Sequence, residues 1–156
     1  MPTPARFGIV TYQERVRVPI LWWIIALGLA LSLDVAVFAY VDLWIAVLFA
    51  VFSTAIVVVG LVGYTLRITV ADDVLRAGRY SLEAEYVGDV TALRGAEADR
   101  VLGPGSDKRS FLITRPFLRD VVKVEIDDDA DPHSAWLINT RKPDELAGAI
   151  RAMQAA

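Results

Sequence analysis

The sequence predicts an α+β protein: a two-helix transmembrane hairpin, then a small antiparallel β barrel or sandwich capped by one C-terminal helix. Three observations predict this class. Residues 18–66 are almost uninterrupted apolar sequence, short β-branched segments with frequent turn signals follow, and an amphipathic helical pattern closes the chain. The expected parts are a cytoplasmic arm (1–18), the hairpin (19–66) and a cytoplasmic β domain (67–156).

The overall composition agrees with a membrane anchor and excludes several kinds of site. The chain has 156 residues and is 55% hydrophobic, which is high for a soluble domain of this size. A formal net charge of −3 lacks the basic footprint of a nucleic-acid-binding protein. Because there are no cysteines, disulfides, thiolate metal sites and cysteine nucleophiles are excluded.

The apolar run is long enough for two membrane spans, each of which needs about 20 apolar residues. We predict the first span over residues 19–39 and the second over 43–66. The connecting turn is so short that the two helices must be antiparallel neighbours. A cleaved signal peptide is the alternative, but the run is too long for one and a second span follows at once.

Positive charge predicts the orientation of the hairpin. Arginines flank both ends of the apolar run, whereas the turn at 40–42 contains neither Lys nor Arg. Both termini should therefore face the cytoplasm, in a multi-pass protein of the cell membrane. The arm itself is expected to be an interfacial helix or a disordered segment. The flanking arginines are Arg6, Arg15, Arg17 and Arg67.

Asp34 is the ionisable residue within the first span, and such residues are candidate functional sites. Neither span contains a Lys, Arg or His that could pair with it. Three interpretations follow: a position near the outer headgroups, a protonated carboxyl bonded to a helix neighbour, or a pair with a basic group on another subunit. The first is favoured because burying an unpaired carboxylate is costly. Asp34 is thus a candidate intramembrane contact.

After residue 65 the pattern predicts seven short strands, a short helix at 95–102 and a final helix. Hairpin turns are expected at Ala71–Asp72 and Gly78–Arg79. The final helix should begin at Pro143 and pack one apolar stripe, which includes Leu146 and Ile150, on the strands. The strands are expected at 65–70, 73–77, 80–82, 87–93, 110–114, 120–126 and 135–139.

This order of strands and one closing helix resembles a pleckstrin-homology-like barrel. Three further segments carry a second resemblance: YQERVRVPILWW (12–23), ITVADDVLRAGRYSLEAEYVGDVTAL (68–93) and WLINTRKPDELAGAI (136–150). They resemble an actinobacterial family of two-helix membrane proteins of unknown function. That resemblance covers nearly the whole chain and implies the hairpin and the β domain, but no activity.

One turn of the β domain combines positive charge with apolar side chains. Arg115 and Arg119 flank Phe117 and Leu118 after the fifth predicted strand. Loops of this kind contact lipid headgroups in some membrane-tethered domains. We therefore regard these four residues as a candidate lipid or partner contact.

No catalytic, cofactor or metal site is predicted. Asp127, Asp129 and Asp131 match the first ligands of a calcium loop, but Pro132 and Ile138 stand where that loop needs Gly and Glu. His133 and Ser134 are adjacent on one loop and cannot face each other as base and nucleophile.

The function expected from these features is a non-enzymatic, membrane-anchored binding or scaffolding module. It would hold a protein partner, or sense lipid, at the inner membrane face. An accessory subunit of a larger membrane complex is the first alternative, and an enzyme of unknown type is the second. The expected partners are the lipid bilayer and a protein, with no nucleic acid.

Overall fold

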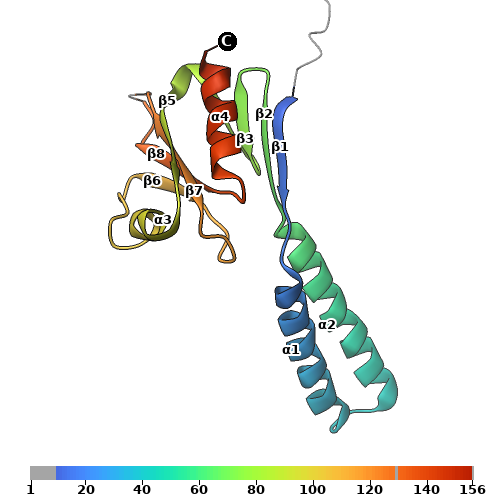
Figure 1. The fold of residues 1–156 in the computed structure, drawn as a ribbon. Coiled ribbons are helices and arrows are strands. Elements are labelled where there is room, and N and C mark those ends of the chain that lie inside the picture. The colour runs from blue at the N-terminus through green and yellow to red at the C-terminus, as the bar shows by residue number, and fades with distance from the viewer. Residues whose placement is uncertain (1–9, 129, 156) are drawn as a thin grey trace, which may run out of the picture. The chain divides into compact units, whose positions relative to one another are not determined.

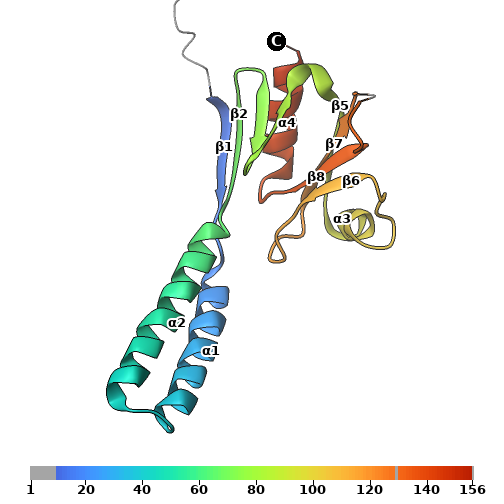
Figure 2. The ribbon, with the colours of Figure 1, turned by 180° about the vertical axis from the view of Figure 1, so that it is seen from behind.

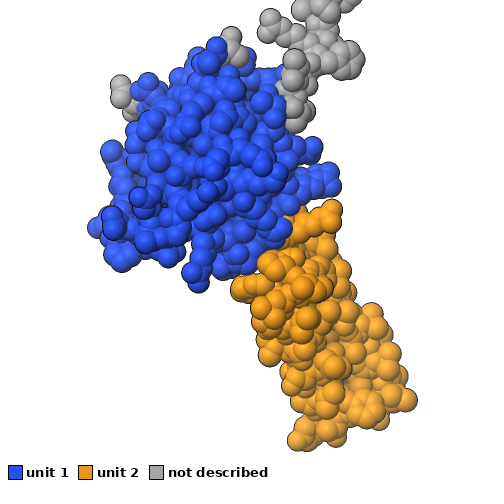
Figure 3. Space-filling view, in the orientation of Figure 1, with its two compact units in different colours: residues 1–16, 66–156 blue, residues 17–65 orange. Residues whose placement is uncertain are grey.

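The computed structural model describes residues 10–128 and 130–155. Arg6 of the predicted arm and Asp129 of the acidic run lie outside the described residues. The described chain has a mixed α+β fold with four α-helices and two β-sheets. It divides into two compact units, residues 17–65 and a β unit made of residues 10–16 and 66–155 (Figure 3).

The first unit is an antiparallel pair of long apolar helices, α1 (Ile20–Phe38) and α2 (Leu43–Gly63) (Figures 1 and 2). Both are long and apolar enough to cross a membrane. No residue of α1 is buried, and Ala46 is the buried residue of α2. The predicted second span ran to residue 66, but α2 ends earlier because Leu66 begins a strand.

The first sheet is an antiparallel meander in the order β1-β2-β3-β4. Val16 at the end of β1 is the register partner of Leu66 at the start of β2. The helical pair is therefore inserted in the sequence between two strands that pair directly with each other. The strands are β1 (Val10–Val16), β2 (Leu66–Ala71), β3 (Val74–Ala77) and β4 (Tyr80–Glu83).

Strand β1 differs from the expectation of an interfacial helix or a disordered arm. Tyr12, Glu14 and Val16 are buried and alternate with exposed residues, which is the period-two pattern of a half-buried strand. That pattern is hard to recognise in the sequence because the middle member is a carboxylate. The strand that pairs with β1 also comes only after both helices.

The β2–β3 turn is formed by Asp72 and Asp73, one residue later than predicted. Both residues have positive φ angles, 49° and 58°. Two consecutive positive φ angles are typical of the type I′ turn, which joins antiparallel strands tightly and tolerates Asp. The next turn contains Gly78 at φ 64°, as the predicted Gly78–Arg79 turn requires.

The second sheet has the order β5-β7-β8-β6, and its last pair, β6 with β8, is parallel. The prediction of an antiparallel arrangement is therefore wrong for this pair. The reason is that the chain reverses twice, into β7 and again into β8, and so regains the direction of β6. Within the described residues the strands form two separate sheets, without a closed barrel. The strands are β5 (Val87–Leu93), β6 (Ser110–Ile113), β7 (Val121–Ile126) and β8 (Ala135–Asn139).

Helix α4 (Pro143–Gln154) packs against strands of both sheets. Leu146 and Ile150 are fully buried in the main core, as the apolar stripe predicted. The 3-10 helix η1 (Ala84–Tyr86) leads into β5. Helix α3 (Gly95–Leu102) covers the other face of the second sheet through Ala98.

Candidate functional site

A buried carboxylate ties β1 to the segment that leads into α4. Glu14 is 9% exposed, and its Oε2 accepts hydrogen bonds from the Tyr12 hydroxyl (2.8 Å) and the Thr140 hydroxyl (2.5 Å). The backbone N–H of Arg141 donates to Oε1 at 3.0 Å. With three donors on one carboxylate, the charge is well compensated for a buried group.

Tyr12 must remain protonated to take part in this network. Burial raises the pKa of its hydroxyl far above the ordinary value, an effect that Thr140 partly offsets and the Glu14 carboxylate strengthens. The network is closed to solvent and offers no open position for a substrate. Its role in the fold is to connect the strand that precedes α1 with the start of α4.

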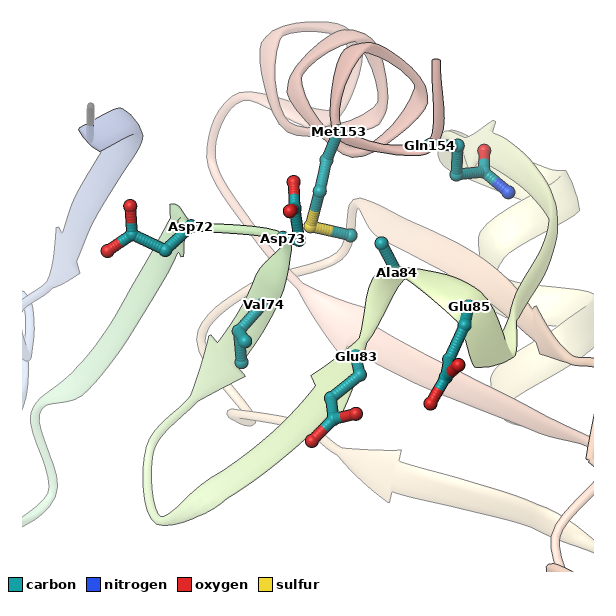
Figure 4. A pocket seen from close by; sticks show the side chains of 8 residues that line it. All are labelled: Asp72, Asp73, Val74, Glu83, Ala84, Glu85, Met153 and Gln154. Carbon is teal, nitrogen blue, oxygen red and sulfur yellow. The ribbon is translucent and has the colours of Figure 1, made fainter. Parts of the chain in front are cut away.

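An open hollow of about 480 Å³ lies beside the β2–β3 turn. Asp72, Asp73, Glu83 and Glu85 contribute carboxylates to its lining (Figure 4). No cluster of three carboxylates or histidines with metal-binding geometry occurs among the described residues. The hollow is therefore a strongly acidic surface. Its other lining residues are Val74, Ala84, Met153 and Gln154.

Asp34 has a partner within the helical pair. The Ser53 hydroxyl lies 2.9 Å from Asp34 Oδ1 and 3.0 Å from the carbonyl oxygen of Ala50. Ser53 is the central residue of the 21-residue helix α2, so the carboxyl group of Asp34 reaches toward the middle of that helix. Of the three interpretations of Asp34, the bond to a helix neighbour is the one that has a contact in the structure.

The predicted basic and apolar turn is closed by a hydrogen bond from the Leu118 N–H to the Arg115 carbonyl at 3.0 Å. Phe117 and Leu118 are half-buried and pack against the main core. Arg119 is exposed. The apolar pair thus contributes to packing, and contact of this turn with lipid or a partner stays a prediction.

The loop around His133 holds its polar groups in separate pairs. His133 Nδ1 lies 2.9 Å from Asp131 Oδ1. The His133 ring packs edge-on against the Phe111 ring, with 5.0 Å between the ring centroids. The Ser134 hydroxyl donates to Asp107 at 2.7 Å. Hydrogen bonds from the Arg109 N–H and from Ser134 lower the pKa of Asp107. Since Ser134 donates to Asp107, it is not activated by His133.

Residues 11–150 match the family described as Protein of unknown function (DUF3093). The chain belongs to the DUF3093 family. No curated protein and no solved structure matches the chain. The DUF3093 match begins within β1 and ends within α4, so it covers α1, α2 and all three donors of the Glu14 network. The family description assigns no activity.

Two features of this DUF3093 chain were not predicted as sites, the Glu14 network and the acidic hollow. The alternation of Tyr12, Glu14 and Val16 is the signal that identifies the first. The second depends on pairing between β3 and β4, which places Glu83 opposite Val74 and thus close to the Asp72–Asp73 turn. Sequence spacing alone does not reveal that proximity.

Proposed function

We propose that this DUF3093 protein is a two-span integral membrane protein that presents its β unit at the cytoplasmic face as a non-enzymatic binding or scaffolding module. The observation that carries the proposal is the insertion of two spanning-length helices between β1 and β2. Because Val16 and Leu66 are register partners, both ends of the helical pair enter the same sheet. A β unit attached in this way is held to the membrane through two adjacent strands.

The lengths of the helices support a membrane hairpin. Helix α1 has 19 residues and α2 has 21, which correspond to roughly 28 and 32 Å at 1.5 Å per residue. A bilayer core is about 30 Å thick. The connecting turn contains Asp42 and neither Lys nor Arg, whereas Arg15, Arg17 and Arg67 flank the strand ends, so the proposed cytoplasmic side is that of the β unit.

The proposed identity of the β unit is a pleckstrin-homology-like domain. A four-stranded meander, three antiparallel strands (β5, β7 and β8) and a closing helix α4 support this proposal. The segment with α3 and β6 is then an addition to that arrangement. An actinobacterial cell membrane is the location that the family resemblance implies.

The proposed partners are the bilayer and a protein that the β unit binds. A non-enzymatic role is supported by the lining of the open acidic hollow, in which no described histidine, lysine, serine or threonine joins the four carboxylates. Glu14 is enclosed by its donors, His133 pairs with Asp131, and the acidic hollow is lined by carboxylates. We expect no cofactor and no nucleic acid.

A second candidate function is an accessory subunit whose helices contact other membrane helices. Asp34 and Ser53 favour it, because a hollow lined by Asp34 and the small residues Ala46 and Ala50 lies on the helical pair, and a second apolar hollow follows along α2. Solubilisation in mild detergent at native abundance separates the two functions. A subunit migrates with a stable larger assembly, whereas a tethered module migrates near its own mass.

The proposed topology can be tested by labelling, because the chain contains no native cysteine. A cysteine at Tyr40 should react with an impermeant reagent in intact cells, whereas one at Ser106 should react only after the cells are opened. The opposite pattern would show that the β unit lies outside. Labelling of both positions in intact cells would contradict a membrane-spanning hairpin.

A further inference from the structure

The outer face of the first sheet carries a charge gradient along its strands. The inner face of β1 and β2 is formed by buried residues, so the side chains between them point outward. Outward-facing Arg15 and Arg67 lie next to Val16 and Leu66, where the chain leaves for the helices and returns. Glu83 and the Asp72–Asp73 turn lie at the opposite end of the strands.

Three arginines of this face form one group, which we call the arginine face: Arg15, Arg67 and Arg76. Arg15 is the direct register partner of Arg67 across β1 and β2. Arg76 pairs with Thr69, two residues further along β2. All three side chains belong to exposed residues.

Like charges directly opposite each other on neighbouring strands repel, so the Arg15–Arg67 pair is unfavourable without an anion nearby. The ion pairs that the structure contains among residues 10–128 and 130–155 lie elsewhere, at Arg94, Lys123, His133 and Lys142. By contrast, Arg79 in the adjacent turn packs its guanidinium over the Tyr80 ring and donates a hydrogen bond to the Tyr80 hydroxyl. Within the described residues, the arginine face therefore forms a positive surface with no ion-pair partner.

The number of connecting residues sets an upper limit on the distance between these arginines and the ends of the helices. Arg15 precedes Ile20 by five residues, and Arg67 follows Gly63 by four. An extended chain spans at most about 3.6 Å per residue. The Cα atom of Arg15 therefore lies within roughly 18 Å of the Cα atom of Ile20, and that of Arg67 within roughly 14 Å of the Cα atom of Gly63. The headgroup layer itself extends about 5–8 Å beyond the bilayer core.

We propose that the arginine face binds the anionic lipid headgroups of the leaflet from which the hairpin emerges. The inference rests on the proposed membrane anchorage. Guanidinium groups bind phosphate oxygens well, and a basic cluster near a membrane is attracted to anionic lipid. The carboxylates at the other end of the strands are repelled by the same surface, so attraction and repulsion together favour one orientation of the sheet.

The test uses the full-length protein in lipid nanodiscs of phosphatidylcholine alone or of an equal mixture with phosphatidylglycerol. A single cysteine at Gln13, on the outer face beside the arginines, carries a fluorophore, and the quencher is a nitroxide on the lipid headgroup. We expect stronger quenching in the anionic discs and loss of the difference at high salt. A label at Glu83, on the same face but at the acidic end, should show no such difference.

The variant R15Q/R67Q/R76Q should lose the difference between the discs, with roughly a fivefold change in the docking equilibrium for each arginine. The matched control K108Q/R109Q/R119Q also removes three exposed positive charges, including that of Arg119 in the earlier candidate turn. This control should keep the difference in quenching between the two kinds of disc. The conservative variant R15K/R67K/R76K should keep it as well. If the triple glutamine variant unfolds, the single variants R15Q, R67Q and R76Q decide the question, since each should weaken the difference and unchanged quenching in all three would overturn the inference.

Three results overturn the inference, and they are distinguishable. Stable insertion into the discs with equal quenching in both lipids, or loss of the difference only in the control variant, removes the arginine face as a lipid surface and leaves the membrane anchorage intact. Failure of the wild-type chain to float with vesicles at all overturns the anchorage and this inference together.

Discussion

The two units of this protein are stabilised in opposite ways. The β unit encloses its own core, and even its buried carboxylate, Glu14, is surrounded by donors. The helical pair buries one side chain, Ala46, and a side-chain hydrogen bond from Ser53 to Asp34 joins its two helices. The β unit therefore has an apolar core of its own, whereas the helical pair leaves nearly all of its apolar side chains exposed.

The largest effect that this comparison predicts follows from removing the helices. If residues 17–65 are replaced by Asn-Gly, a two-residue turn can join Val16 to Leu66, and the shortened chain should be soluble and unfold cooperatively. A chain that begins at residue 66 lacks β1 and loses the burial of Tyr12 and Val16, about 1.5–3 kcal/mol each. Thermal melts followed by circular dichroism should separate the two. Equal melting curves would show that β1 is not part of the core.

Substitution of a core residue in α4 should have the next largest effect. Leu146→Ala removes a fully buried side chain and should cost about 2–5 kcal/mol of unfolding free energy. The exposed Asp144 on the same helix is the matched control, since its ion pair with Arg94 is solvent-exposed and Asp144→Ala should change little. Chemical denaturation of the shortened chain measures both. A wild-type midpoint for Leu146→Ala would show that α4 is not the cap of the core.

Glu14→Gln tests the buried network without changing its size. In this variant an NH2 group, which is a donor, replaces one oxygen of the carboxylate. It must face either the Tyr12 and Thr140 hydroxyls or the Arg141 N–H, and all of these groups are donors in the network. We expect a loss of about 1–3 kcal/mol. Glu97→Gln, on the exposed surface of α3, is the control. Two equal denaturation midpoints would mean that the network does not stabilise the β unit.

Tyr12 makes the same region sensitive to alkaline pH. Its pKa is raised in the folded state above the ordinary value of 10.0, so the folded protein holds this proton more tightly than the unfolded chain. The stability that results is fully present below pH 10 and is lost as the pH rises above it. Tyr12→Phe should flatten this decline in denaturation midpoints measured between neutral pH and pH 11. An unchanged alkaline decline would assign it to other groups.

The smallest effect is expected at the helical pair. Asp34→Asn and Ser53→Ala should each change helix association by about 0.6 kcal/mol, the usual contribution of such bonds in membranes. Insertion, abundance and any co-purifying protein should therefore stay nearly constant in membrane preparations. Loss of a co-purifying protein in Asp34→Asn, with the hairpin still inserted, would make Asp34 a partner-binding residue.

Much of the fold could be predicted because local patterns determine it. The apolar run of 18–66 marks both helices, and the strand at 87–93 and the helix at 95–102 have their predicted bounds. Strand β1 was missed because its partner β2 is distant in sequence and Glu14 interrupts its apolar alternation. Local propensity contains no information on such long-range pairing.

The sites were less predictable, because each depends on register. Arg15 and Arg67 are 52 positions apart in the sequence, and only the pairing of β1 with β2 brings them face to face. The chain therefore lacks a basic cluster along its sequence, although the fold assembles one. Asp34 was recognised from its chemistry, but Ser53 as its partner follows only from the packing of α1 on α2.

The insertion of α1 and α2 between paired strands also constrains how the protein is made. A ribosome adds about 5–20 residues per second, so β1 must wait several seconds, through the synthesis of residues 17–65, before β2 exists. If the helical pair spans a membrane, as proposed, the first sheet can close only when both helices have entered the bilayer and Leu66 has returned to the side of Val16. A hairpin that inserts only one helix leaves β1 and β2 on opposite sides. On that proposal, folding of the first sheet requires completed insertion, and a failed insertion leaves β1 without its partner strand β2.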